Sequence, residues 1–128
     1  MVGKNRKILI VDDDINIRES LKIPLILRGY EILEASNGQD GLMIARKEKP
    51  LIILLDILLS KLDGFRVARF LKFDERYKDI YMIAITQLGR QETQDEAQRM
   101  GFNSFMTKPL DTEAVIEKIE RMVAEHQN

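Results

Sequence analysis

The sequence predicts an α/β fold in which a parallel five-stranded β-sheet lies between two layers of helices. Two observations lead to this prediction. Apolar, β-branched runs alternate five times with stretches of helical hydrophobic spacing, and every connection between them is short. Such alternation is typical of parallel sheets with right-handed crossovers. The 128 residues fit one domain, with no repeat and no linker rich in Pro, Gly or Ser.

The first strand is expected at residues 7–11, an apolar run that is followed by three aspartates. A helix comes next, because Leu21 and Leu25 lie on one helical side and Gly29 ends the pattern. Residues 30–35 mix glutamates with apolar residues, which suits a strand at the edge of the sheet.

The middle of the chain repeats this order. Leu42 and Ala45 mark a second helix that ends at Pro50, and residues 51–55 form the second apolar run. Continuous apolar runs of this length suit strands buried on both faces. The third helix has its apolar residues at helical spacing: Phe65, Ala68 and Leu71.

The last third supplies two more units. Residues 80–85 form the third apolar run, and the mostly polar helix at residues 90–100 ends at Gly101. Residues 102–108 mix polar and apolar side chains like an edge strand. The fifth helix opens at Asp111, a favourable N-cap. Its apolar face contains Val115, Ile119, Met122 and Val123.

With the three apolar runs at the centre and the two mixed strands at the edges, the pattern fits a flavodoxin-like (βα)5 three-layer sandwich. The expected strand order is 2-1-3-4-5. In sheets of this kind, ligands bind at the carboxyl ends of the strands, where the first and third strands lie side by side.

Composition excludes several classes of function. Lys and Arg number 20 against 21 Asp and Glu, so the formal charge is −1 and direct nucleic-acid binding is not favoured. There is no cysteine, and the only histidine is His126, which argues against thiolate zinc sites and Ser-His triads. The most apolar stretch, residues 51–59, contains Asp56 and is too short to span a bilayer. With no targeting segment either, we expect no membrane contact and a cytoplasmic location.

Chemically active side chains follow the ends of the expected strands. Asp12, Asp13 and Asp14 follow the first strand, and Asp56 follows the third. Two carboxylates about 4 Å apart repel by roughly 4 kcal/mol at an effective dielectric constant near 20, so the cluster needs a proton or a cation. Hard carboxylate oxygens suit Mg²⁺, which keeps waters and accepts a phosphate oxygen.

A carboxylate beside Mg²⁺ can attack phosphorus and form an acyl phosphate. Thr86 follows the fourth strand, and Lys108 ends the fifth, directly before Pro109. These two side chains could supply a donor and a positive charge to the phosphoryl group. Each feature alone is ordinary, since aspartates start loops and cap helices, threonine favours strands, and loop lysines are solvated. Their combination in a five-unit chain is much more specific.

With these residues in these positions, the chain resembles the chemotaxis-regulator-like receiver domain of bacterial two-component response regulators. The resemblance covers nearly all of residues 1–128, with an ordered core expected at about 6–124. It depends on four segments: residues 8–14 (ILIVDDD), 54–64 (LLDILLSKLDG), 84–86 (AIT) and 105–109 (FMTKP). It implies a single receiver domain, with no effector domain in this chain.

The resemblance also implies residue roles. Asp56 is the expected phosphoacceptor. Asp12 and Asp13 are the expected acidic pair that holds Mg²⁺, together with Asp56 and the backbone carbonyl of Leu58.

Three further residues are expected to respond to the phosphoryl group. Thr86 supplies the switch hydroxyl, Lys108 pairs with the phosphoryl oxygens, and Phe105 is the aromatic residue that turns inward on activation. The family also has a cis peptide bond before the proline that matches Pro109.

Three positions depart from the family pattern. Ser60 stands where proline is usual, so we expect a less rigid loop after Asp56. Gln87 replaces a small residue, and we expect it to alter the lifetime of the phosphorylated state in a direction that the sequence does not decide. Pro24 lies inside the first helix, beside extra apolar residues. These residues are Ile23, Ile26 and Leu27. We favour extra packing under a bent helix for them, with an apolar partner surface as the alternative.

The hypothesis for function is therefore a phosphorylation-dependent signalling switch. A sensor histidine kinase or phosphotransfer protein is the expected donor, and a downstream protein target or effector domain the expected receiver of the signal. The surface of the fourth helix, fifth strand and fifth helix is expected to change, and a homodimer is possible. The domain is a signalling protein that catalyses its own phosphorylation and dephosphorylation, not an enzyme with a separate substrate.

Three alternatives stay open. An aspartyl-phosphate phosphotransferase would use the same acids, but no insertion that could cap a substrate is visible. A nucleotide or flavin binder should carry a Gly-rich phosphate loop where residues 12–14 are acidic. A receiver-like interaction module that is never phosphorylated would not need the acids, Thr86 or Lys108.

Overall fold

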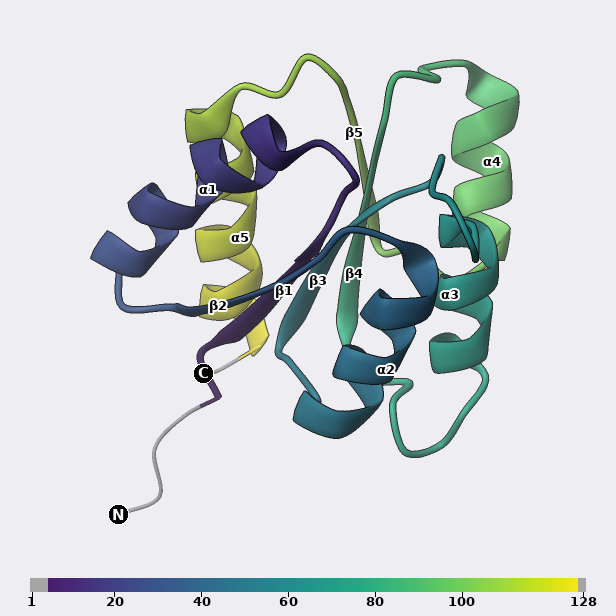
Figure 1. The fold of residues 1–128 in the computed structure, drawn as a ribbon, viewed down its shortest axis with the longest axis horizontal. Helices are drawn as coiled ribbons and strands as arrows, with labels where there is room; N and C mark the ends of the chain where they lie inside the picture. The colour runs from purple at the N-terminus through teal and green to yellow at the C-terminus, as the bar shows by residue number, and fades with distance from the viewer. Residues whose placement is uncertain (1–4, 127–128) are drawn as a thin grey trace.

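A computed structural model describes residues 5–126 and has the predicted architecture (Figure 1). Its five strands are all parallel and lie in the order β2-β1-β3-β4-β5, which confirms the predicted order. The strands are β1 (Lys7–Val11), β2 (Glu31–Ala35), β3 (Ile52–Asp56), β4 (Tyr81–Thr86) and β5 (Ser104–Thr107).

Five helices cover the two faces of the sheet. They are α1 (Ile15–Leu27), α2 (Gly38–Glu48), α3 (Gly64–Lys72), α4 (Gln91–Arg99) and α5 (Thr112–His126). Figure 1 shows α1 and α5 on one face and α2, α3 and α4 on the other. The fold is thus the three-layer sandwich that the alternation predicts.

The apolar run of β1 shows why the central strands contain almost no polar residues. Ile8 and Ile10 pack on the side of α1 and α5, whereas Leu9 and Val11 pack on the side of α2 and α3. All four are fully buried, because successive side chains of a strand point to opposite faces and here both faces are covered. The edge strand β2 is only partly buried over most of its length, as its glutamates predict.

Polar residues at the helix ends set the boundaries of the helices. The side chain of Asp14 accepts a hydrogen bond from Asn16 N at 2.8 Å and caps α1. Asp63 caps α3 and Asp111 caps α5 in the same way, the latter as predicted. Gly29, which follows the end of α1, has a φ of 92°, a backbone conformation that favours glycine.

The structure of α1 corrects the packing expected from the sequence for its extra apolar residues. Ile23, Ile26 and Leu27 do not pack under a bent helix, since their exposed fractions are 60%, 46% and 80%. The core-facing side of α1 is set by the fully buried Leu21 and Leu25, and helical spacing places these three residues away from it. The structure shows an exposed apolar surface on α1, and its role as a partner surface stays a prediction. Within residues 5–126, no helix is long and apolar enough to cross a bilayer.

Tyr30 connects the start of β2 to α5 and gives the fold a measurable pH dependence. Its hydroxyl donates a hydrogen bond to Glu120 Oε2 at 2.8 Å, and the side chain is buried. Burial raises the pKa of Tyr30 to about 12, and the hydrogen bond to Glu120 and its charge add to the shift.

The folded chain therefore keeps this proton at pH values where the unfolded chain has lost it, so stability falls as pH rises from about 10 to about 12. We expect the free energy of unfolding to drop by about 2 kcal/mol more in the parent protein than in Tyr30→Phe over this interval. Urea unfolding at a series of pH values measures the free energy of unfolding of both proteins. Parallel curves for the two proteins would contradict the assignment.

Candidate functional site

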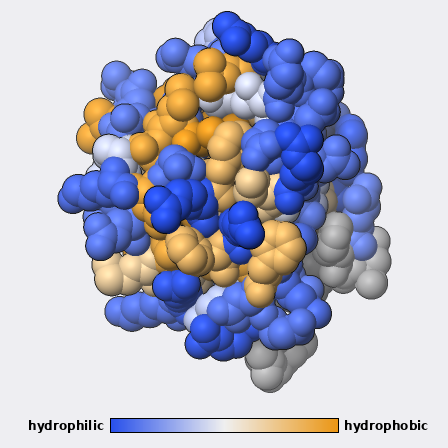
Figure 2. Space-filling model, turned by 90° about the vertical axis from the view of Figure 1, so that its right-hand side faces the viewer, coloured by the Kyte–Doolittle hydropathy of each residue, from blue (hydrophilic) through white to orange (hydrophobic). Residues whose placement is uncertain are grey.

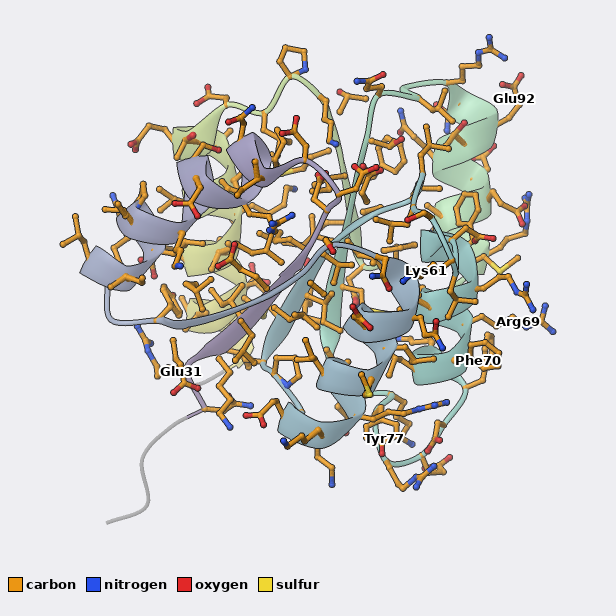
Figure 3. All side chains as sticks on the ribbon, in the orientation of Figure 1. Glu31, Lys61, Arg69, Phe70, Tyr77 and Glu92 are labelled. Atoms are coloured by element: carbon orange, nitrogen blue, oxygen red, sulfur yellow. The ribbon has the colours of Figure 1, made fainter. Side chains whose placement is uncertain are left out.

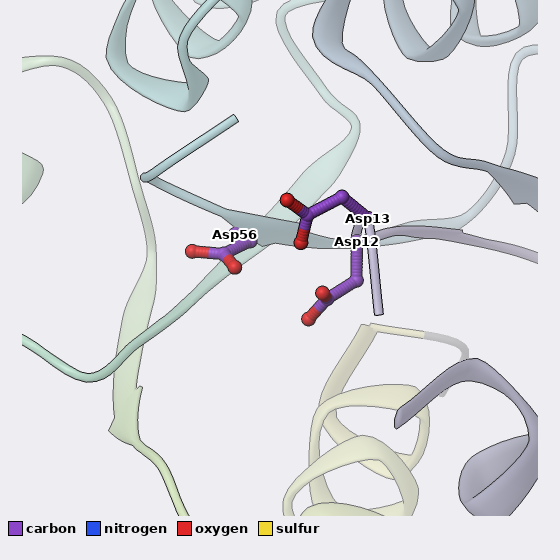
Figure 4. Close-up of side chains that lie close together, drawn as sticks. All are labelled: Asp12, Asp13 and Asp56. Atoms are coloured by element: carbon purple, nitrogen blue, oxygen red, sulfur yellow. The ribbon is translucent and has the colours of Figure 1, made fainter. Parts of the chain in front are cut away.

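Three carboxylates come together where β1 and β3 end. Val11 pairs with Leu55 in the sheet, so the next residues, Asp12 and Asp56, lie at the same edge. Carboxylate oxygens of Asp12, Asp13 and Asp56 all lie within 4.8 Å of one another (Figure 4). The predicted convergence is confirmed for these three. Asp14 is the exception, because its side chain caps α1 instead.

Two of the three carboxylates are almost fully removed from solvent. Asp12 is 0% exposed and Asp56 is 4% exposed, whereas Asp13 lies at the surface. Backbone N–H groups fix one oxygen of each buried acid. Asp14 N donates to Asp12 Oδ1 at 2.9 Å, and Leu58 N donates to Asp56 Oδ1 at 3.0 Å. The orientation of both carboxylates is thus set by the loops that follow the strands.

Lys108 faces the other two oxygens. Its Nζ lies 2.8 Å from Asp56 Oδ2 and 2.9 Å from Asp12 Oδ2. It donates a hydrogen bond to Asp56, whereas its contact with the buried Asp12 Oδ2 is an ion pair that falls short of hydrogen-bond geometry, so this oxygen has no well-aligned donor among residues 5–126. One ammonium thus contacts two carboxylates of a cluster of three, so negative charge exceeds positive charge in the cluster. A hard divalent cation with oxygen ligands fits this donor set, and the fit rests on the excess of carboxylates over ammonium and on the buried Asp12 oxygen that has no well-aligned donor.

The pKa values of the buried pair reflect the same competition. Burial raises the pKa of Asp12, and the charge of Asp56 adds to the rise, while Lys108 and a backbone N–H oppose it. Burial also acts to lower the pKa of Lys108, but its contacts with Asp56 and Asp12 outweigh burial and leave it raised. The lysine is therefore a firmly protonated cation in the site.

Thr86 ends β4 at the same edge and is fully buried. Its Oγ1 accepts a hydrogen bond from Leu88 N at 3.2 Å, and its backbone carbonyl accepts one from Lys108 N at 2.8 Å. The peptide bond between Lys108 and Pro109 is cis, as the resemblance implied. Thr86 thus brings the ends of β4 and β5 together beside the acids.

The remaining predicted residues surround this centre. Phe105 on β5 is partly buried and packs against the cluster on the α2–α3 side. Gln87 is exposed directly after Thr86. The carbonyl of Ser60 accepts hydrogen bonds from Gly38 N at 3.3 Å and from Leu62 N at 2.8 Å. The loop after Asp56 is therefore held against the start of α2 although it lacks a proline.

Sequence reasoning missed Arg18, which supports the site from α1. Its Nη1 donates to the backbone carbonyl of Asp12 at 2.6 Å, and its Nε pairs with Glu34 Oε1 at 3.1 Å. Lys22, one turn further along α1, pairs with the other oxygen of Glu34 at 3.1 Å. In the sequence, this role is indicated only by the spacing of four residues between Arg18 and Lys22, which places both on one side of α1. That spacing points to Glu34 only when β2 is known to lie beside α1.

The fold and the site together define a flavodoxin-like α/β protein with an acidic cation site and a lysine at the carboxyl edge of its sheet. Comparisons with known proteins agree with this class. The family model of the response regulator receiver domain matches residues 8–120. The chain belongs to the response regulator receiver domain family, and phosphoacceptance in two-component signalling is the function this family supports.

Two relatives illustrate the range of proteins in which such a domain occurs. The DNA-binding dual master transcriptional regulator RpaA of Synechocystis is 34% identical over 117 residues, which are 91% of this chain and 48% of RpaA. The chain thus spans about half the length of that relative. Protein PilH of Pseudomonas aeruginosa is 35% identical over 118 residues, which are 92% of this chain and 98% of PilH.

Solved structures confirm the fold. A CheY-like response regulator receiver domain protein from Methanospirillum hungatei superimposes with a TM-score of 0.88 at 27% identity. The match covers 97% of this chain and 98% of that one.

Proposed function

We propose that Asp56 is the residue that accepts the phosphoryl group, from the phosphohistidine of a sensor histidine kinase or a phosphotransfer protein. The observation that carries this proposal is the state of the two buried acids. Lys108 contacts one oxygen of Asp56 at 2.8 Å and one oxygen of Asp12 at 2.9 Å, and Asp13 adds a third carboxylate to the cluster. Three carboxylates against one ammonium leave room for a cation, and with that cation bound the pocket can accept an anionic phosphoryl group at Asp56.

The carboxylates of Asp12, Asp13 and Asp56 and the backbone carbonyl of Leu58 would hold Mg²⁺. When bound, the ion neutralises negative charge and offers open positions to phosphate oxygens. An oxygen of Asp56 attacks phosphorus, a P–O bond forms, and the P–N bond to the donor histidine breaks. Lys108 stabilises the negative charge on the transferring group.

The domain then loses the phosphoryl group by hydrolysis. A water molecule attacks phosphorus, the bond between phosphorus and the Asp56 oxygen breaks, and inorganic phosphate leaves. The protein groups that assist both reactions belong to this chain, so we propose that the domain, with Mg²⁺, catalyses its own phosphorylation and dephosphorylation. It remains a signalling protein because the modified residue is its own.

The phosphoryl group would then act as a switch. It adds about −1.5 to −2 charges beside Thr86 and Lys108. We propose that the Thr86 hydroxyl gives up its bond to Leu88 N to reach the new oxygens, and that Phe105 turns inward behind it. Helix α4 is the element best suited to shift, because Ala97 is its only fully buried residue within Gln91–Arg99. The surface of α4, β5 and α5 would present the result to a target.

Incubation with a small phosphoryl donor such as acetyl phosphate, with Mg²⁺ or with EDTA, tests the proposed function. Intact-protein mass spectrometry should show up to one added phosphoryl group per chain with Mg²⁺ and none with EDTA. Equal incorporation under both conditions, or none under either, would refute a metal-dependent phosphoacceptor.

Gln87 and Ser60 are the proposed modulators of the phosphorylated state. Gln87 is exposed and adjacent to Thr86, so its long side chain stands where it can crowd the phosphoryl group or orient the attacking water. We expect Gln87→Ala to change the dephosphorylation rate by about threefold or more, which is about 0.7 kcal/mol in the barrier. Phosphoryl loss after removal of the donor measures it, with Ser60→Ala as a second variant. Equal rates in Gln87→Ala and the parent would remove Gln87 from this role.

We base the proposed partners on the family and on relatives such as RpaA, of which this chain spans about half. A kinase or phosphotransfer protein supplies the phosphoryl group, and a target protein or an effector domain reads the switch. We also propose a homodimer that forms through α4, β5 and α5, and a cytoplasmic location.

A further inference from the structure

A second feature of the surface lies away from the acidic site, between α2 and α3. A groove of about 830 Å³ is lined there by Arg46 of α2, by Arg66, Arg69 and Phe70 of α3, and by residues 73–76 that follow α3. We call it the α2–α3 groove. Figure 3 shows Arg69 and Phe70 pointing outward from α3, and Figure 2 shows hydrophobic side chains at the surface of this side of the molecule among hydrophilic ones.

The groove exposes two phenylalanines that the fold does not need. Helix α3 packs on the sheet through Val67, Ala68 and Leu71, which are at most 1% exposed. Phe70 and Phe73 are 45% and 73% exposed. Covering exposed aromatic surface is favourable, so two neighbouring exposed rings are typical of a site that binds another molecule.

The charge of the groove is positive and only partly neutralised. Its two acids are already paired, Asp74 with Arg76 at 2.8 Å and Glu75 with Lys78 at 2.9 Å. The contact with Arg76 lowers the pKa of Asp74 to about 2, so this acid stays ionised and committed to Arg76.

Of the other three arginines of the groove, Arg46 also acts on Asp74 through its charge. No ion pair with another residue of the described chain is formed by Arg46, by Arg66 or by Arg69. The guanidinium of Arg46 lies over the ring of Phe70, 5.9 Å from its centroid. Because guanidinium groups bind carboxylates in a forked, bidentate geometry, a ligand with several carboxylates matches this surface.

We propose that the α2–α3 groove binds an acidic segment of a partner protein that carries an aromatic or aliphatic anchor. The anchor covers Phe70 and Phe73, and the acids pair with Arg46, Arg66 and Arg69. A single-stranded nucleic acid fits less well, because the chain as a whole has a charge of −1 and lacks the net basic character of nucleic-acid binders. The proposal does not depend on phosphoryl transfer, since none of these residues lines the acidic site.

Peptide display on the complete chain tests the proposal. Selection from a random peptide library should enrich sequences that combine Asp or Glu with Phe, Leu or Trp. The affinity of the best peptide is then measured by fluorescence anisotropy. Arg66→Glu/Arg69→Glu should weaken binding by about tenfold or more, and so should Phe73→Ser.

Matched variants outside the groove serve as controls. Arg99→Glu and Arg121→Glu reverse exposed arginines on α4 and α5, and Leu27→Ser removes an exposed apolar residue of α1. Each should change the affinity by less than about twofold. Amide NMR spectra confirm that every variant is folded, and the shifts caused by the peptide should lie on α2 and α3.

Four results would overturn the proposal. They are a selection without enrichment, peptide binding that the groove variants leave unchanged, a single-stranded oligonucleotide that binds the groove more tightly than any peptide, and self-association of the parent that Arg66→Glu/Arg69→Glu abolishes. The third would make the ligand a nucleic acid, and the fourth a second copy of this chain.

Discussion

Asp56→Asn is expected to lose phosphoryl incorporation, with a fall in rate of about 10³-fold or more. The amide is a poor nucleophile, and no neighbouring acid is placed to replace the carboxylate. Asp12 is fully buried, with one oxygen held by Asp14 N and the other facing Lys108. Asp13 is exposed and is expected to react only weakly. Incorporation from acetyl phosphate with Mg²⁺, followed by mass spectrometry, measures the loss.

The matched control for this variant is Asp14→Asn. It makes the same chemical change within the acidic run, but Asp14 caps α1 and lies outside the carboxylate cluster, and asparagine caps helices as well as aspartate does. Asp14→Asn should therefore retain incorporation close to that of the parent. Full stoichiometric incorporation in Asp56→Asn would show that the phosphoacceptor has been assigned to the wrong residue.

Lys108→Met is expected to have the largest effect on stability, a loss of about 3 kcal/mol in the absence of divalent cations. The Lys108 side chain is 11% exposed and lies within 2.9 Å of both buried carboxylates. Methionine keeps much of the volume but leaves Asp12 and Asp56 facing each other without a counter-charge. Urea unfolding in EDTA measures the loss. Mg²⁺ should stabilise this variant more than the parent, because the ion then supplies the missing charge.

A second substitution separates this electrostatic effect from lost packing. Asp12→Asn removes one of the two opposing charges, so Lys108→Met/Asp12→Asn should recover at least about half of the lost stability. If the double variant were no more stable than Lys108→Met, the loss would come from packing and the account of the site's charge balance would fail.

The strands and the main site residues were predictable from the sequence for one physical reason. Strands buried on both faces appear as uninterrupted apolar runs, so the first polar residue after each run marks the carboxyl edge of the sheet. Asp12, Asp56 and Thr86 are such residues. Their convergence then follows from the strand order, and a flavodoxin-like order is the one that fits three apolar runs at the centre and two mixed strands at the edges.

The features that the sequence did not decide depend on the direction of single side chains. Three consecutive aspartates follow β1, and only the backbone shows that Asp14 caps α1 while Asp12 and Asp13 join the cluster. The contact of Arg18 with Asp12 and Glu34 joins α1, the acidic loop and β2, which are separate in the sequence. The exposed residues of α1 and the α2–α3 groove likewise appear only when the core-facing side of each helix is known.

The most direct test of the phosphoacceptor site is binding of beryllofluoride, a mimic of the phosphoryl group, in the presence of Mg²⁺. A structure of this complex should show the mimic bonded to Asp56, Mg²⁺ among Asp12, Asp13 and Asp56, and the Thr86 hydroxyl turned away from Leu88 N toward the fluorides. Binding at another residue, binding that needs no Mg²⁺, or an unchanged Thr86 and Phe105 would contradict the account.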